Sequence, residues 1–367
     1  MRITTQKKYS LLQQSMCQTY GVNSVSSAFA VTEPLETRLI GKIQDSSAFL
    51  QMINMLPVTD KKGQALNIWV TNPLSKRTDV SNKDRKPVFM SSPDGLEYEC
   101  MLTETDIAFS YELLDIWARY ENFMEMYLNQ VYRRISLDKI LIGWYGKKAA
   151  KETDIESNPN LEDVNKGWLT LLKDEKPEHY LTESSDDTGQ ITIGMAGDYK
   201  NLDAITYDIF SMIEVAQRSG NEVAVVGRQL VADDMGKALS SFAQQPTEKS
   251  QVMILEKTYG GLPSLIVPNF PDKGLVVTDP KNLSIYFQSG RMRRKMEDKP
   301  ERNCVVDFMS SNDSYMIENL DSIAGIEANN VVFLDEEPPQ PEKPGKRNRD
   351  KEENPKPEDN TEPGTAV

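Results

Sequence analysis

The strongest periodic pattern of apolar residues in the chain lies between residues 119 and 144. Apolar side chains recur there at helical spacing, at Phe123, Tyr127, Val131 and Ile135. This spacing predicts a helix with one apolar face, and Gly143 and Gly146 are suited to end it. At 1.5 Å per residue the predicted helix is about 39 Å long, which suits the spine of a domain.

A weaker helical pattern occupies the N-terminal segment, residues 1–30. Its apolar positions are Tyr9, Leu12, Met16 and Tyr20. The pattern stops at Gly21, and two interpretations stay open: a helix that docks on a partner, or a mobile terminus. After Pro34 a further apolar pattern of helical spacing runs to Pro57, which is expected to end it.

Two segments with strand-like patterns, 65–70 and 97–109, flank an unusual stretch of polar sequence. The stretch between them, 72–95, contains three prolines and the basic residues Lys76, Arg77, Lys83, Arg85 and Lys86. Compact domains seldom carry loops beyond about 12–15 residues unless the loop has a function. We therefore expect a long hairpin that leaves the body of the subunit to contact a neighbour, with an ordinary surface loop as the alternative.

The second half of the chain alternates short predicted strands and helices. Helices are expected at 161–172, 202–218 and 230–242. Strands are expected at 222–227, 264–267, 275–278, 283–288 and 304–308, and residues 323–334 return the chain to its earlier part. No internal repeat is present. These elements place the chain in the α+β class.

The C-terminal segment, 335–367, differs sharply from the rest. It holds seven of the twenty prolines, ten acidic and six basic residues, and no aromatic residue. Such a composition buries too little apolar surface to offset the entropy of ordering the chain. We expect a solvated, disordered tail, or a partner-binding extension.

Composition restricts the possible functions. The 367-residue chain carries 42 Lys and Arg against 56 Asp and Glu, a net charge of −14. This excess of acids argues against a general nucleic-acid-coating protein, which needs net positive charge. No apolar stretch approaches the roughly 18 residues of a membrane span, and the first thirty residues lack the apolar core of a signal peptide. We therefore expect a cytosolic chain with no membrane partner.

Catalytic and metal-binding chemistry finds little support in the sequence. The three cysteines lie far apart, and the phosphate and zinc motifs GxGxxG, GxxxxGK[ST] and HExxH do not occur. His179, the single histidine, is expected in an exposed loop. Asp233 and Asp234 are the best candidates for a metal pair, but adjacent acids early in a helix also favour its positive end. The sequence therefore predicts no cofactor, and a cytosolic metal-dependent α/β enzyme is the less favoured alternative.

The densest run of positive charge spans residues 291–295. In an extended strand, Arg291, Arg293 and Lys295 would share one solvated side. Alternatively, the run faces phosphate or acidic residues of another subunit. The candidate intersubunit contacts are Arg291, Arg293 and Arg294 of this run and Lys83, Arg85 and Lys86 of the long hairpin.

The order of these parts is similar to that of the shell proteins of tailed double-stranded-DNA phages and herpesviruses. Eight segments narrow the resemblance to the major capsid protein family of the peduovirus type. They are DSSAFLQMINMLPV (45–58), LLDIWARYENF (113–123), RRISLDKILIGWYG (133–146), SNPNLEDVNKGWL (157–169), GDYKNLDAI (197–205), VVGRQLVAD (225–233), GGLPSLIVPNFP (260–271) and NLSIYF (282–287). These structural motifs follow one collinear order over about residues 33–330.

The resemblance implies a tailed-phage capsid-shell fold with seven divisions. They are an N-terminal segment removed on maturation (1–30), an N-terminal arm (31–63), an extended loop (64–109), a spine helix with a peripheral domain (110–190), an α/β axial domain (191–288), a return to the peripheral domain (289–334) and the tail (335–367). It also implies trimming by a prohead protease near Ala30 and Val31, where small residues precede the bond.

By the same resemblance, the chain is expected to act by association and not as an enzyme. It would self-assemble into hexamers and pentamers of an icosahedral head enclosing double-stranded DNA, without sequence-specific binding. Expected partners are a scaffolding protein, the prohead protease and a portal protein. The chain would be assembled in the host bacterial cytoplasm and reside in the virion. A non-viral nanocompartment shell of the same fold is the alternative.

Overall fold

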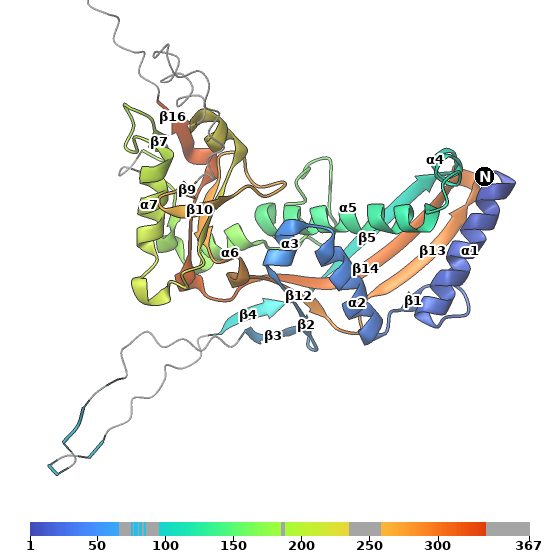
Figure 1. The fold of residues 1–367 in the computed structure, drawn as a ribbon, viewed down its shortest axis with the longest axis horizontal. Coiled ribbons are helices and arrows are strands. Elements are labelled where there is room, and N and C mark those ends of the chain that lie inside the picture. The colour runs from blue at the N-terminus through green and yellow to red at the C-terminus, as the bar shows by residue number, and fades with distance from the viewer. Residues whose placement is uncertain are drawn as a thin grey trace, which may run out of the picture.

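The computed structural model describes residues 1–65, 75, 77–79, 81–82, 84–85, 95–184, 188–234 and 258–334. Within these ranges the molecule is elongated. A long sheet with helices α1, α2 and α5 forms one end, and a compact module around helix α7 forms the other (Figure 1). Among the described residues, no helix combines the length and the apolar character needed to cross a membrane.

A long sheet of six strands builds the elongated end. Its central strand β14 (Cys304–Ile317) is flanked by β13 (Arg293–Lys299) and then β12 (Leu283–Gln288) along one side, and by β5 (Met101–Ser110) along the other. The N-terminal part adds β1 (Phe29–Ala30), antiparallel to β13, and β2 (Asn54–Val58), parallel to β12. Distant parts of the chain therefore meet in one sheet.

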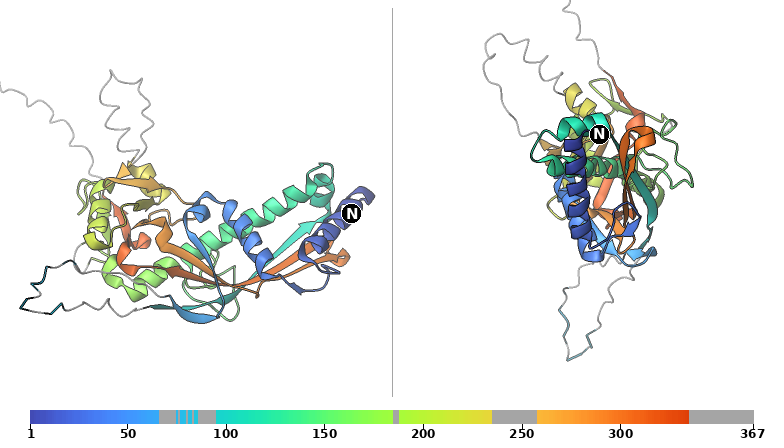
Figure 2. Two further views of the ribbon diagram at one scale, coloured as in Figure 1. Left: turned by 60° about the horizontal axis from the view of Figure 1, so that its bottom comes forward. Right: turned by 90° about the vertical axis from the view of Figure 1, so that its right-hand side faces the viewer.

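Helices cover one face of this sheet, and the other face is open along β5 and the start of β13 but buried at β12. The helices of this part are α1 (Ile3–Tyr20), α2 (Glu33–Asp45), α3 (Ala48–Met52), α4 (Tyr111–Trp117), α5 (Phe123–Tyr145) and α6 (Trp168–Glu175). The right-hand view of Figure 2 shows α1 and α5 on one side and the strands on the other. Burial along β5 alternates residue by residue, as expected for a sheet covered on one side.

The N-terminal helix α1 packs against the chain's own core. It ends at Gly21, whose φ of 65° closes the helix where the apolar pattern stops. Leu12 and Met16 are buried, and the Tyr20 hydroxyl accepts a hydrogen bond from Arg294 Nη1 at 2.9 Å. The segment that we expected to dock on a partner or to be mobile therefore buries its apolar face within the subunit.

The compact module contains a second six-stranded sheet, ordered β6-β15-β11-β8-β10-β9. Its strands are β6 (Tyr180–Leu181), β8 (Val223–Val226), β9 (Thr258–Tyr259), β10 (Leu262–Leu265), β11 (Leu275–Thr278) and β15 (Ile323–Ile326). Helix α7 (Leu202–Met212) packs Ile205 and Ile209 into its core. Two small pairs complete the described strands: β7 (Ile191–Ile193) with β16 (Val331–Phe333), and β3 (Lys62–Ala65) with β4 (Leu96–Glu99). One apolar cluster lies between α7 and one face of the second sheet, whereas the other extends from the long sheet to the opposite face of the second sheet, at Val225 and Val276.

Several predicted helices differ in extent. Of the helix expected at 161–172, only the part in α6 forms, because Leu161 has a left-handed φ of 57° and Gly167 caps the helix. The helix expected at 202–218 ends at Met212.

The boundaries of three other predicted elements also change. The spine helix α5 begins at Phe123 and not at 119, after a turn that follows α4. Pro57 lies inside strand β2 and does not end a helix. The helix expected at 230–242 begins at Arg228, and its part beyond 234, like the tail 335–367, lies outside the described residues.

The two modules interleave along the chain more than the expected divisions allowed. Strand β12, expected in an axial domain of residues 191–288, pairs in the long sheet. Strands β15 and β16, expected in a return segment of residues 289–334, instead lie in the second sheet and beside β7. The reason is that the chain crosses between the modules three times, after α6, after β11 and after β14.

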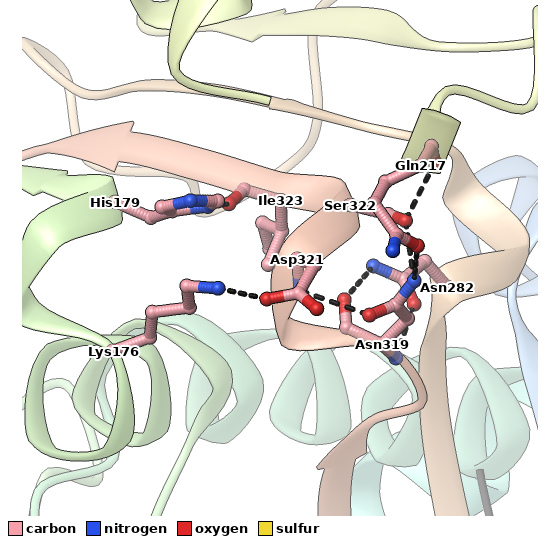
Figure 3. A network of polar contacts seen from close by, with 8 residues as sticks. All are labelled: Lys176, His179, Gln217, Asn282, Asn319, Asp321, Ser322 and Ile323. Atoms are coloured by element: carbon pink, nitrogen blue, oxygen red, sulfur yellow. Dashed lines mark hydrogen bonds and ion pairs between the residues drawn. The ribbon is translucent and has the colours of Figure 1, made fainter. Parts of the chain in front are cut away.

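All three crossings pass through one polar cluster (Figure 3). Lys176, on the first crossing, forms an ion pair with Asp321 on the third. Asn282, on the second, donates to the backbone carbonyl of Asn319 at 2.9 Å and accepts from its N–H at 2.7 Å. The Asn319 side chain also donates to Gln217 at 3.0 Å. Direct hydrogen bonds therefore hold the two modules together at this point.

His179 lies at the same junction and is buried, contrary to our expectation of an exposed loop residue. The short 3₁₀ turn Pro177–His179 directs the ring inward, leaves it 7% exposed, and lets Nδ1 donate to the carbonyl of Ile323 at 2.8 Å. Burial lowers the pKa of the imidazole, because the charged form would lose its hydration. The polar neighbours of His179 in sequence concealed this contact with a residue 144 positions away.

Candidate assembly surfaces

A two-stranded ribbon projects from the body at the start of the extended loop (Figure 1). Strands β3 and β4 pair antiparallel, and the Lys62 ammonium lies 2.8 Å from the Glu99 carboxylate. The hydrogen bond from Lys62 lowers the pKa of Glu99. The Tyr98 ring packs edge-on against Tyr286 of β12, with 5.2 Å between ring centroids. The base of the loop is therefore anchored to the long sheet.

The basic residues expected at the tip of this loop are only partly described. Lys83 and Lys86 lie outside the described residues, whereas Arg85 is exposed. An exposed arginine beyond an anchored ribbon is available to another subunit. It remains a candidate contact on that ground.

The expected cleavage point lies at the end of the long sheet. Ala30 is exposed in β1, whereas the next side chain, Val31, is 2% exposed. The Val31 N–H donates to the carbonyl of Met292 at 2.9 Å. The Ala30–Val31 bond therefore lies in an extended segment whose C-terminal side is anchored in the core.

The alternation along β13 separates the arginines of the basic run onto two faces. Arg291 and Arg293 are exposed, whereas Arg294 is 1% exposed. Successive side chains of a strand point to opposite faces, which explains the separation. The guanidinium of Arg294 is used inside the chain, so we propose only Arg291 and Arg293 of this run as intersubunit contacts.

Arg294 and Asp307 form a buried bidentate ion pair beneath α1 and α5. Arg294 Nε donates to Asp307 Oδ1 at 3.0 Å, and Nη2 donates to Oδ2 at 2.6 Å. The Tyr127 hydroxyl also donates to Oδ2, at 3.1 Å. Burial acts to lower the pKa of Arg294, but the Asp307 charge outweighs it and raises that pKa. Burial, with the same charge, raises the pKa of Tyr127. These hydrogen bonds therefore join helix α5 to strands β13 and β14.

The open face of the long sheet carries charges that the sequence analysis did not single out. On β5, Glu104 and Asp106 are exposed and form what we call the acidic row. On β13 and the turn before it, Arg291 and Arg293 form the basic row. The alternate positions Glu104, Asp106 and Ser110 are polar and indicate an exposed strand face, but the pairing with β14 was needed to place the two rows on one surface.

Asp233 and Asp234, the candidate metal pair, lie more than a turn inside the helix that begins at Arg228. Asp234 Oδ2 accepts a hydrogen bond from the Tyr259 hydroxyl at 3.3 Å. Across the part of the chain that the structure describes, no group of three or more His, Cys, Asp or Glu residues could hold a metal ion. Asp234 therefore joins the helix to strand β9.

The fold combines a long helix packed on one face of a sheet, a projecting ribbon and a compact α/β module. Together these parts define a shell-forming capsid protein. The chain matches the family model for the phage major capsid protein, P2 family, over residues 8–329. It therefore belongs to the P2 family of phage major capsid proteins, and it is a protein of the virion capsid that assembles into capsid oligomers.

Relatives and solved structures agree with this assignment. The chain is 34% identical to the capsid proteins of Escherichia phage P2 over 331 residues, covering 87% of this chain and 92% of the relative. It is 31% identical to the major capsid protein of Serratia phage KSP20, covering 83% and 90%. A subunit of the satellite phage P4 procapsid superposes with a TM-score of 0.73 at 32% identity, covering 91% and 99%. The family model and both relatives support a phage capsid protein over the nanocompartment alternative.

Proposed function

We propose that this chain builds an icosahedral head from hexamers and pentamers and that the head encloses double-stranded DNA. The observation that carries the proposal is the superposition on a procapsid subunit over nine tenths of the chain. The subunit acts by association and not by catalysis. Many weak contacts of arm, loop and sheet become collectively strong in a closed symmetric shell. The net charge of −14 suits a protein shell that encloses dense DNA without sequence-specific binding.

The proposed partners are a scaffolding protein, a portal protein and a prohead protease that cuts between Ala30 and Val31. An extended segment at the end of a sheet suits a protease, which binds its substrate as a strand. The cut would remove three basic residues and no acidic residue. It would also detach α1 covalently from the core that it covers.

The first experiment is sedimentation velocity on the purified chain, alone and after co-production with the neighbouring head proteins. We expect ring- or shell-sized species in the second sample, containing a chain that mass spectrometry shows to begin at Val31. A monomer or dimer in both samples would contradict the proposed shell. Shells made of full-length chain would contradict the proposed cleavage alone.

Charge reversal in the extended loop gives a second prediction. Arg85→Glu combined with Lys86→Glu should lower the yield of particles about tenfold or more, because like charges across an interface cost several kcal/mol. The melting temperature of the unassembled chain should stay at its wild-type value. The matched control is Lys148→Glu with Lys151→Glu, at two exposed lysines in a different loop. Wild-type particle yield from the loop variant would exclude this contact.

A further inference from the structure

The open face of the long sheet lies along β5 and the start of β13, where no other described element covers it. Three contacts place helices on the opposite face: Tyr20 of α1 with Arg294, Tyr127 of α5 with Asp307, and Glu36 of α2 with the turn before β13. Residues 102, 104, 106, 108 and 110 of β5 point away from that side and are exposed. Their side chains face solvent within the subunit.

The two charged rows lie on the same face, and Arg293 of the basic row is in register with Glu104 of the acidic row. Arg293 pairs with Ser310 on β14, and Ser310 pairs with Glu104 on β5. The neighbouring line across the sheet runs from Lys295 through Phe308 to Asp106. Two strand spacings of roughly 4.8 Å therefore separate the basic side from the acidic side. The surface is polarised, with positive charge along one margin and negative charge along the other.

Neither row is neutralised within the subunit. In the described ranges, no ion pair involves Glu104, Asp106, Arg291 or Arg293. Partial burial, with the charges of Glu104 and Asp307, raises the pKa of Asp106, and the Lys299 charge only partly opposes this shift. The acidic row therefore has a local excess of negative charge that a cation from outside the subunit would relieve.

The positions of the rows suit contact between neighbours in one layer. Among the strands that the structure describes, β5 pairs with β14 alone, so its other edge is free of them. On the other margin, β1 pairs outside Arg293 and Arg294, and the Val25 carbonyl accepts from the Met296 N–H at 2.8 Å, so a neighbour would meet the exposed arginine side chains and not a bare strand edge. Two copies placed side by side bring the acidic margin of one next to the basic margin of the other. Such a head-to-tail contact can repeat and close into a ring.

We propose that the acidic row of one subunit, Glu104 and Asp106, docks against the basic row of the next, Arg291 and Arg293, in a head-to-tail contact between sheet margins. The proposal rests on the proposed shell function and adds to it the partner surface for the basic run. The partner is a second copy of this chain, because one copy carries both complementary margins. Electrostatic matching of this kind fixes orientation and excludes wrong pairings.

A competing explanation is that the charges only keep the sheet edges apart. Charged side chains on edge strands prevent edge-to-edge aggregation in many proteins. Under that explanation, reversing the sign of one row preserves its effect, because either sign blocks pairing. Under the docking proposal, sign is decisive. Reversing one row gives like charges at every contact, and reversing both rows restores the match.

The test compares three variants produced with the head proteins. The first carries Glu104→Lys and Asp106→Lys, the second Arg291→Glu and Arg293→Glu, and the third all four changes. Each two-residue variant should lower the yield of shell-sized particles by about tenfold or more, since like charges across an interface cost several kcal/mol. The four-residue variant should return to within about threefold of wild type because opposite charges again face each other.

The control variant carries Glu301→Lys and Arg302→Glu, an exposed pair beside the rows, and should assemble normally. Melting temperatures of all unassembled chains should match wild type, since none of the four row residues has an ion pair to lose. Normal yield from either two-residue variant would overturn the docking contact, as would failure of the four-residue variant to recover. Wild-type chain that forms no shells would overturn the proposed function and the contact with it.

Discussion

Arg294→Met should lower the free energy of unfolding by about 3–5 kcal/mol, the cost of leaving a buried charge without its partner. Asp307 is fully buried, and its carboxylate receives both hydrogen bonds of the Arg294 fork. Methionine supplies neither donor, so Asp307 must keep an unpaired charge or take up a proton. Chemical unfolding of the unassembled chain, followed by tryptophan fluorescence, measures the loss.

Arg293→Met provides the matched control one residue away. Its guanidinium is exposed, and a surface substitution of this kind changes stability by less than about 0.5 kcal/mol. A variant with Arg294→Met, Asp307→Leu and Tyr127→Phe removes the polar cluster together. It should recover most of the loss, because apolar residues of similar volume replace buried ion pairs well. Equal effects of the Arg293 and Arg294 changes would contradict the assignment of a buried pair.

Gly143→Ala should destabilise the chain by up to about 3 kcal/mol, the cost of overfilling a packed core. A Cβ on Gly143 would lie 2.6 Å from Cη2 of Trp168, well inside contact distance. The Trp168 ring cannot give way, because it is fully buried between Phe49, Trp144 and Tyr315. The spine helix therefore needs glycine where it crosses α6.

Gly41→Ala on α2 is the control for the effect of helix propensity. A Cβ there meets no atom within 4 Å, so alanine should stabilise the helix by up to about 1 kcal/mol. Both substitutions replace glycine by alanine, but Gly143→Ala should lower the free energy of unfolding and Gly41→Ala should raise it. The same unfolding experiment compares them. A stabilising Gly143→Ala change would contradict the close approach of α5 and Trp168.

Sequence periodicity was sufficient to predict an element wherever its burial pattern depends on residues close in the chain. The spine helix and the stop of α1 at Gly21 were predicted because each depends on local spacing. Alternation in the basic run placed Arg291 and Arg293 on one side, and the structure confirms that side as exposed. The same alternation places Arg294 on the opposite side, where Asp307, 13 residues later in the chain, binds it.

Features that depend on contacts between distant parts of the chain could not be predicted from local sequence patterns. The burial of His179 is set by Ile323, and the acidic row becomes a surface only through the register of β5 with β14. The helix expected at 161–172 fails at Leu161, because its left-handed backbone conformation serves a turn that periodicity does not record. The three crossings between modules were hidden for the same reason, since sheet pairing and not strand propensity decides them.

The packing of α1 has a consequence for synthesis of the chain on the ribosome. Tyr20 binds Arg294, a residue 274 positions later. At a translation rate of about 5–20 residues per second, the helix waits roughly 14–55 s for its binding partner to be made. During this interval α1 can already meet Leu39 and Leu128, which line one pocket with Leu12 and Met16, but the strands β13 and β14 are not yet made. Folding of the long sheet is therefore largely post-translational, because its central strand β14 is the last of its strands to leave the ribosome.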